Sequence, residues 1–233
     1  MVLLTLDASS STASVCVTRD DALLYESYLH NGRMHAAVLM PMVEDALRCA
    51  GLEIADVDVF GCVVGPGSFT GVRIGVATVM GLAGDKPCAP VDGLEALAAQ
   101  GAGFSGLLCP ILDARAGQVY AAIFDGAGAR LTPDAPIKLE ALLEDLRGRG
   151  EPCLFLGDGA AANLERLREE PFARIAPEPL RGLRASFAAQ IAARRPETYV
   201  PAAQLRPLYL RAPQAERARN ERLGLAGEGE KHG

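Results

Sequence analysis

The sequence predicts an α/β fold made of two similarly built lobes. Its first 29 residues read as three short strands joined by tight turns, which is typical of a β-meander. The glycine-rich stretch GAGFSG at 101–106 then breaks the pattern, and the chain restarts with strands followed by mixed helix and strand. With 233 residues and 49% hydrophobic content, the chain has enough apolar material for a sizeable core.

The first half contains the following expected elements in order. Strands are predicted at 2–6, 13–18 and 22–29, with Asp20 and Asp21 as turn residues. A helix with apolar spacing covers 34–50 and ends at Gly51, and a strand follows at 56–64. After a glycine-rich motif we expect a helix at 72–84, a strand at 88–91 and a helix at 94–100 that is capped by Asp92 or Gly93.

The second half is predicted to begin with strands at 107–113 and 119–124 and a turn at Asp125-Gly126. A helix at 139–147, a strand at 153–156, a turn at 157–159, a helix to about 169 and a helix at 186–195 complete it. We assign 1–104 to an N-terminal lobe, 105–205 to a C-terminal lobe, and 206–233 to a segment that packs back and then becomes a mobile tail. The tail from 214 is charged and rich in glycine, with little apolar surface to bury.

Composition narrows the class of protein. A formal net charge of −6 and a pI near 5.2 argue against autonomous nucleic-acid binding, which depends on Lys and Arg. The six cysteines form no CxxC pair and suit a reducing compartment. Met1 leads directly into VLLTLDAS without the pattern of a signal peptide, and no uninterrupted apolar segment reaches the ~20 residues of a membrane span. We therefore expect a soluble cytoplasmic protein.

The stretch GPGSFTG at 65–71 predicts a sharp turn from a strand into a helix. Its glycines admit positive φ, Pro66 restricts φ, and Ser68 or Thr70 can cap the helix that follows. It matches neither GxxxxGK[ST] nor GxGxxG, so it is not a known nucleotide-binding loop of those types. Two readings remain open: the helix start presents N–H groups to an anion, or the turn only lets the helix pack tightly against its strand.

The stretch LTLDASSS places a carboxylate at the end of the first strand beside small hydroxyl residues. In phosphate-binding folds such a hairpin lets hydroxyls and N–H groups approach a phosphate while the carboxylate orients water or a metal. The alternative is an Asp that caps the turn. The possible anion- or nucleotide-binding residues of both stretches are Asp7, Ser9, Ser10, Gly65, Gly67, Ser68, Thr70 and Gly71.

No catalytic residue and no metal site are predicted. The three histidines form no HxxxH or HExxH spacing, and no Ser/His/Asp arrangement is visible.

The helices at 34–50 and 72–84 carry more apolar surface than one core-facing stripe needs. The first has an apolar arc of roughly 200°, and the second is apolar nearly all round. Either a protein partner or another layer of the same chain must cover this surface. The candidate contact residues are His35, Val38, Leu39, Met42, Val43, Ala46, Arg73, Val76, Val79 and Met80, with His35 alternatively a hydrogen-bonded packing residue.

Five stretches together resemble the bacterial TsaB (YeaZ-like) family. They are LTLDASSS at the N-terminus, His35 followed by LMPMV, GPGSFTGVRIG at 65–75, LDARAGQVY at 112–120 and PLYLR at 207–211. The resemblance spans nearly the whole chain in order. It implies the two-lobe actin-like and sugar-kinase-like (ribonuclease H-like) ATPase fold, in which each lobe is a mixed sheet flanked by helices.

The resemblance also implies a function. The family is a subunit of the complex that transfers threonylcarbamoyl to N6 of adenosine 37 in tRNAs reading codons that begin with adenine. The implied role is a non-catalytic scaffold that docks onto a TsaD-like catalytic subunit through its N-lobe helices, with a TsaE-like ATPase joining. It further implies tRNA contact only through the complex, a homodimer when alone, no membrane contact, and no tightly bound cofactor, with ATP or ADP at the complex interface.

Two residues depart from the family pattern. Ala8 stands where Thr is usual, which removes a hydroxyl from the hairpin, and Gln118 stands where Glu is usual. An alternative function is an ATP-dependent phosphotransferase of actin-like fold that acts alone through Asp7 and the GPGSFTG helix start. A peptidase is a weaker third reading, because neither a metal motif nor an evident nucleophile is visible.

Overall fold

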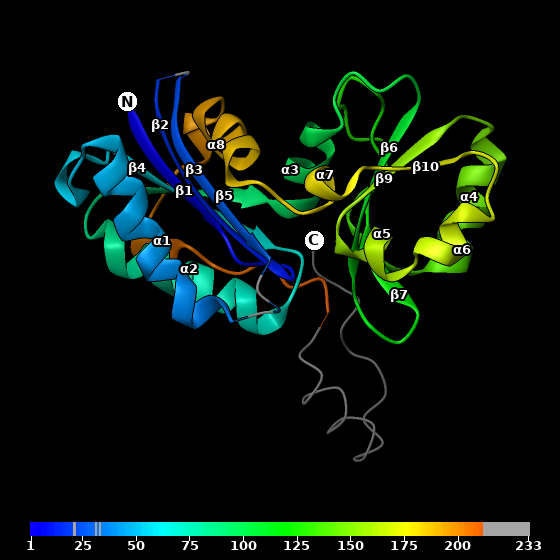
Figure 1. Cartoon of the computed structure of the whole chain (residues 1–233), viewed down its shortest axis with the longest axis horizontal. Helices are drawn as coiled ribbons and strands as arrows, with labels where there is room; N and C mark the ends of the chain where they lie inside the picture. Colours follow the sequence, from blue (N-terminus) through cyan, green and yellow to red (C-terminus); the bar gives the residue numbers. More distant parts are fainter. Residues whose placement is uncertain (21, 31, 33, 212–233) are drawn as a thin grey trace, which may run out of the picture.

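A computed structural model describes residues 1–20, 22–30, 32 and 34–211. Two lobes lie side by side, each built around one sheet (Figure 1). The tail that we expect to be mobile lies outside the described residues. The first sheet has the strand order β11-β5-β4-β1-β2-β3 and the second has the order β10-β9-β6-β7-β8.

The first sheet consists of β1 (Val2–Asp7), β2 (Thr12–Arg19), β3 (Ala22–His30), β4 (Val59–Gly65), β5 (Pro87–Asp92) and β11 (Val200–Pro201). It is a mixed sheet, because β1 pairs antiparallel with β2 but parallel with β4, and β4 pairs parallel with β5. The three-stranded meander predicted at the N-terminus is confirmed. β1 and β4 are buried along their whole length, as expected for central strands covered on both faces.

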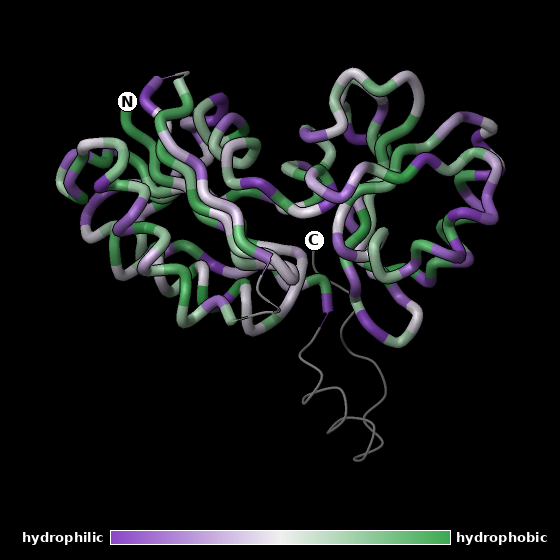
Figure 2. Tube along the Cα trace, in the orientation of Figure 1, coloured by the Kyte–Doolittle hydropathy of each residue, from purple (hydrophilic) through white to green (hydrophobic). Residues whose placement is uncertain are grey.

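Helices cover both faces of the first sheet. On one face, α1 (His35–Ala50) and α2 (Phe69–Ala83) pack against each other and against the strands, with Leu4 and Leu6 in their shared core. On the other face, Leu3 and Cys16 pack with α3 (Gly93–Gln100) and α8 (Ala185–Ala193). Successive residues of β1 thus point to opposite layers, as strand geometry requires. Figure 2 shows the apolar residues concentrated along the central strands.

The predicted helix ends agree with local chemistry. Gly51 ends α1 in the left-handed conformation, with φ of 66°, and its amide reaches the last carbonyls of the helix. Asp92 caps α3 by accepting a hydrogen bond from the Glu95 amide at 2.9 Å. Both signals could be read from the sequence because caps depend on neighbours in the chain.

The second lobe holds a smaller mixed sheet. Its strands are β6 (Leu107–Asp113), β7 (Gln118–Ala121), β8 (Ala135–Lys138), β9 (Cys153–Leu156) and β10 (Ala173–Ile175). Its helices are α4 (Leu139–Arg149), α5 (Asp158–Ala162), α6 (Leu164–Arg168) and α7 (Glu178–Arg181). β6 pairs parallel with β9 and antiparallel with β7. The predicted strands at 107–113 and 153–156 are confirmed.

Several predicted boundaries differ from the structure. The strand predicted from 56 begins at Val59, because Glu53 and Asp56 close a short 3₁₀ helix at Ile54–Asp56 through a capping box. The helix predicted from 72 begins earlier, at Phe69. The helix predicted up to about 169 is divided into α5 and α6, since the Asn163 side chain donates to the Gly159 carbonyl and closes the first turn.

The last part of the chain returns to the first sheet. α8 packs on β1 and β2, and β11 pairs antiparallel with β5. The segment 185–205, which the sequence analysis groups with the second lobe, therefore lies on the first. One core cluster joins the lobes, because it contains Leu3 and Val63 of the first sheet together with Leu108, Phe124 and Leu156 of the second lobe.

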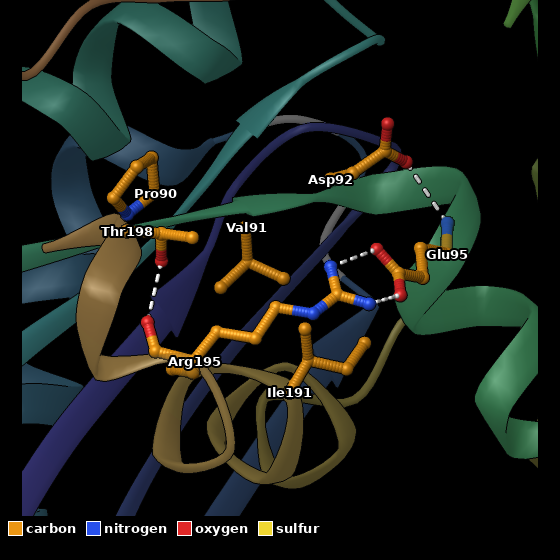
Figure 3. A pocket seen from close by; sticks show the side chains of 8 residues that line it. Pro90, Val91, Asp92, Glu95, Ile191, Arg195 and Thr198 are labelled. Carbon is orange, nitrogen blue, oxygen red and sulfur yellow. Dashed lines mark hydrogen bonds and ion pairs between the residues drawn. The ribbon is translucent and has the colours of Figure 1, made fainter.

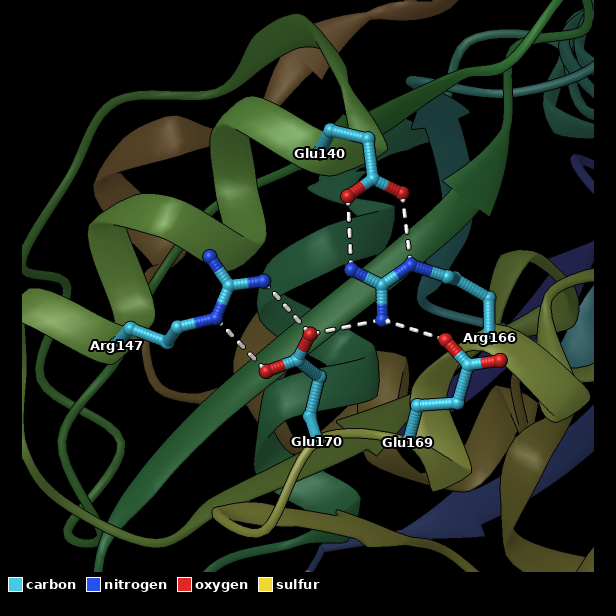
Figure 4. A network of polar contacts seen from close by, with 5 residues as sticks. All are labelled: Glu140, Arg147, Arg166, Glu169 and Glu170. Carbon is cyan, nitrogen blue, oxygen red and sulfur yellow. Dashed lines mark hydrogen bonds and ion pairs between the residues drawn. The ribbon is translucent and has the colours of Figure 1, made fainter.

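A polar network closes the outer side of the second lobe (Figure 4). The buried carboxylate of Glu170 accepts two hydrogen bonds from Arg147, at 2.9 and 2.7 Å, and one from Arg166, at 2.7 Å. These guanidinium groups lower the pKa of Glu170 to about 2. Arg166 also pairs with Glu140 on α4, so the network fastens α6 to α4.

None of the helices in the described ranges is long and apolar enough to cross a membrane.

Candidate functional site

The two predicted motifs meet where β1 and β4 end. The amide of Ser68 donates to the carbonyl of Ser9 at 2.6 Å, so the GPGSFTG turn lies directly on the hairpin after β1. A Cβ on Gly67 would lie 2.2 Å from the Ser9 carbonyl oxygen, and one on Gly71 would lie 2.0 Å from that of Ala8. These distances are far inside van der Waals contact with backbone. Glycine is required here because the helix start touches the hairpin backbone.

The first turn of α2 is satisfied in part by the chain itself. The Ser68 amide is used by Ser9, and the Gly71 amide donates to the Ser68 hydroxyl at 3.4 Å. Thr70 lies on the exposed side of this turn. The structure therefore brings together Asp7, Ser9, Ser10, Gly65, Gly67, Ser68 and Gly71 as the sequence suggests. The contacts it describes are those of a helix-positioning turn, and anion binding stays a prediction.

Asp7 is fully buried at the end of β1. Its Oδ1 accepts the Ser9 amide at 2.9 Å. Burial raises the pKa of Asp7 from 3.8 to about 6, partly opposed by the hydrogen bonds from Ser9, and the negative charge of Asp158 adds to the rise. A carboxyl with this pKa changes its charge close to physiological pH.

Asp158 links the two lobes beside Asp7. It lies at the start of α5, and its carboxylate accepts the Ser11 amide of the first lobe at 3.2 Å and the Asp113 amide of the second at 3.0 Å. A carboxylate thus lies against the hairpin amide that a phosphate would approach in a phosphate-binding fold. We call this arrangement of Ser11, Asp113 and Asp158 the inter-lobe link.

His35 fastens α1 to the same hairpin. Its Nε2 lies 2.9 Å from the Ser10 carbonyl oxygen, and its Cδ2 would lie 3.3 Å from a Cβ on Gly71. The side chain is buried, with 2% of its surface exposed. His35 is therefore a packing residue in this chain, which is the alternative that the sequence analysis left open.

Most of the predicted contact residues are not at the surface. Val38 is half-buried, Arg73 and Met80 are exposed, and the others belong to the chain's own core: His35, Leu39, Met42, Val43, Ala46, Val76 and Val79. The reason is that α1 and α2 cover each other as well as the sheet. The wide apolar arc of each helix thus faces two internal neighbours, which corrects the residue-level prediction.

A smaller apolar surface remains on these two helices. Met34, Met40 and Met80 expose 63%, 39% and 37% of their surface. Ala77 is exposed, and nothing lies within 4 Å of where a Cβ on Gly81 would be. We call Ala77, Met80 and Gly81 the open side of α2. The sequence analysis names Met80 but not Ala77 or Gly81, because the burial of each face depends on the neighbouring helix.

The segment from 206, which the sequence analysis expects to pack back, contacts the end of β4 at Leu208. The amide of Leu208 donates to the Val64 carbonyl at 2.7 Å, and the Leu208 carbonyl oxygen lies 2.6 Å from where a Cβ on Gly65 would be. Gly65 has φ of 124°, a conformation that favours glycine. In Figure 1 the segment (orange) runs beneath the first sheet toward the second lobe.

A cavity of about 140 Å³ lies at the end of β5 (Figure 3). Val91 and Ile191 give it an apolar floor, and the guanidinium of Arg195 is paired with Glu95, with Nη1 2.9 Å from Oε2. Asp92 lies at its edge, where burial and the nearby Asp134 carboxyl raise its pKa. The polar groups around this cavity form hydrogen bonds and ion pairs with one another, so its role is structural.

Among the residues that the structure describes, no group of three or more His, Cys, Asp or Glu side chains could hold a metal ion.

Comparison with known proteins shows the family to which the chain belongs. The family described as "TsaD: tRNA N6-adenosine threonylcarbamoyltransferase" matches residues 30–218. The tRNA threonylcarbamoyladenosine biosynthesis protein TsaB of Bacillus subtilis is 34% identical over 174 residues, which cover 72% of this chain and 76% of that protein. The chain belongs to the TsaB (YeaZ-like) family. TsaB of Escherichia coli is 37% identical over 126 residues, about half of each chain (52% and 53%).

A solved structure of the TsaB family supports the assignment. YeaZ from Pseudomonas aeruginosa has a TM-score of 0.73 and 28% identity, and the match covers 90% of this chain and 99% of that one. The two-lobe α/β fold class with a mixed sheet in each lobe is thereby confirmed. A shorter match is to an enzyme: the tRNA N6-adenosine threonylcarbamoyltransferase of Novosphingobium aromaticivorans is 40% identical over 65 residues, 27% of this chain and 19% of that protein.

Proposed function

We propose that this chain is a non-catalytic scaffold subunit of the complex that transfers threonylcarbamoyl to N6 of adenosine 37 in tRNA. Its role is to bind a TsaD-like catalytic subunit through α1 and α2. Membership in the TsaB family and the shared sequence with a threonylcarbamoyltransferase support this proposal. Two related chains can pair through equivalent surfaces, as two identical chains do in a symmetric dimer.

The observation that carries the proposal is the open side of α2. Ala77, Met80 and Gly81 present small and apolar groups on one side of α2, with Met40 exposed on α1 and Met34 exposed at the N-cap of α1. Small residues let another helix approach closely, and methionine adapts to irregular partners. The same surface would join two copies of this chain when the catalytic subunit is absent.

The proposal includes the other members of the complex. A TsaE-like ATPase joins the pair, and tRNA is held chiefly by the catalytic subunit, consistent with the net charge of −6 of this chain. The amides of Ser11 and Ser68 already donate hydrogen bonds to Asp158 and Ser9 of the same chain. ATP or ADP therefore binds at the interface with the partner.

The test is co-purification and sizing with the TsaD-like partner. We expect the wild-type chain to form a stable complex and Ala77→Glu/Met80→Glu to lose it, because two carboxylates would be buried without partners. The matched control is Ala141→Glu/Leu131→Glu, which changes two exposed apolar residues of the second lobe in the same way. Equal complex formation by the two double variants, or none by the wild type, would contradict the proposal.

A further inference from the structure

The segment 205–211 carries a surface that the docking role does not use. Its backbone is held by the hydrogen bond from the Leu208 amide to the Val64 carbonyl, and the side chains of Arg206, Leu208 and Tyr209 are exposed. Tyr209 stacks on Phe69 of α2, with ring centroids 5.0 Å apart and an angle of 29° between the planes. The guanidinium of Arg73 lies 5.2 Å from the Phe69 ring centroid. Tyr209 keeps 44% of its surface exposed, so it offers aromatic surface to a ligand.

Arginines accompany this aromatic pair. Within the described ranges, the side chains of Arg73, Arg206 and Arg211 form no ion pair with a carboxylate, in contrast to most arginines of the second lobe. Arg206 and Arg211 contact only backbone carbonyls in the bonds that we observe, those of Leu205 and Ala114. Three arginines without an ion pair in the described ranges thus belong to the same two segments, α2 and 205–211, as the exposed aromatic pair.

We propose that this strip, defined as Phe69, Arg206, Tyr209 and Arg211, binds a single-stranded segment of RNA. Tyr209 would stack on a base, and the guanidinium groups would contact the flanking phosphates. An acidic peptide would use the arginines but not the stacked ring, so RNA fits the strip better. The inference rests on the proposed function and deepens it: this chain contacts tRNA directly, in addition to the contacts of its partner.

The experiment measures tRNA affinity of the reconstituted complex with the TsaD-like partner at several salt concentrations. Tyr209→Leu, which keeps apolar packing on Phe69 but cannot stack, is expected to weaken binding about tenfold. Tyr209→Phe should stay within about twofold of wild type, because it retains the aromatic ring. Arg211→Gln should reduce the slope of log affinity against log salt by about 0.7. Arg174→Gln is the matched control, since Arg174 also contacts only backbone carbonyls in the bonds observed, on β10 of the second lobe.

The possible outcomes separate this inference from the proposed function. Unchanged tRNA affinity of a complex that contains Tyr209→Leu would overturn the inference and leave the scaffold role intact. Loss of the partner instead of tRNA would make the strip a protein contact and would also overturn it. Where the wild-type chain forms no complex, the scaffold role fails, and the same variants titrated with tRNA at low salt decide the inference independently.

Discussion

The protonation of Asp7 depends on its burial in the fold. Burial raises its pKa to about 6, so the ionised form is less stable in the folded chain than in the unfolded one. The protonated carboxyl is the form that the folded chain favours. Its contribution to stability is therefore fully present below the unfolded pKa of about 4 and is lost as pH rises through the folded pKa of about 6. The free energy of unfolding is measured with urea at pH 4.5 and at pH 8 for wild type and Asp7→Asn. Between these two pH values, wild type should lose about 2 kcal/mol more than Asp7→Asn. A difference that does not change with pH would show that the carboxyl is solvated.

For single residues, local roles such as turn and cap residues were easier to predict from the sequence than contacts between distant parts of the chain. The turn at GPGSFTG and the capping Ser68 follow from local preferences, and both are present. That Gly67 and Gly71 are needed because of the Ser9 and Ala8 carbonyls could not be predicted, since the contact joins positions about 60 residues apart. For the same reason His35 could be weighed as a packing residue or a contact residue but not assigned.

Among the elements, α2 can pack against the first hairpin because Gly71 has no Cβ. Gly71→Ala would place a Cβ 2.0 Å from the Ala8 carbonyl oxygen, so the helix or the hairpin must shift. We expect a cost of about 3 kcal/mol in the free energy of unfolding. Gly81→Ala in the same helix meets nothing within 4 Å and should stabilise it by about 0.5 to 1 kcal/mol. Denaturant unfolding of both variants checks the pair, and similar effects would contradict the close contact.

Long elements with a clear hydrophobic period were predictable. Short strands were not, and neither were the neighbours of a helix that is buried on two sides. α4 and β9 follow from their apolar spacing, whereas β8 contains Pro136 and β10 has only three residues, so neither pattern indicates a strand. The apolar arc of α1 was correctly observed but could not reveal which neighbour covers it. Leu39 and Val43 are buried by the sheet and by α2, so the arc is mostly internal.

For the whole molecule, the inter-lobe link gives a direct prediction. Asp158 accepts amides from both lobes, so Asp158→Ala should speed hydrogen exchange at Ser11 and Asp113 by about tenfold or more. Asp125→Ala is the matched control, because Asp125 accepts the Ala127 and Ala129 amides within one loop of the second lobe. Unchanged exchange at Ser11 in the Asp158 variant would mean that the lobes are not linked there in solution.

The two-lobe architecture was predictable, but the path of the chain through it was not. The break at 101–106 precedes the first strand of the second sheet, as expected. The return of α8 and β11 to the first sheet has no local signal, because Ala188 and Ala192 would suit either lobe. Packing partners of a short apolar helix are decided by the remaining open face of a sheet, which only the assembled fold defines.

The most direct test of the account is formation of threonylcarbamoyladenosine in tRNA by the TsaD-like partner, supplied with ATPase subunit and increasing amounts of this chain. The account predicts product with wild type and with Ala141→Glu/Leu131→Glu, and far less with Ala77→Glu/Met80→Glu. It also predicts that excess of the latter variant restores the rate, because the variant loses affinity for the partner and not chemistry. Full activity of Ala77→Glu/Met80→Glu at low concentration, or a loss that no excess restores, would contradict docking as the function of this chain.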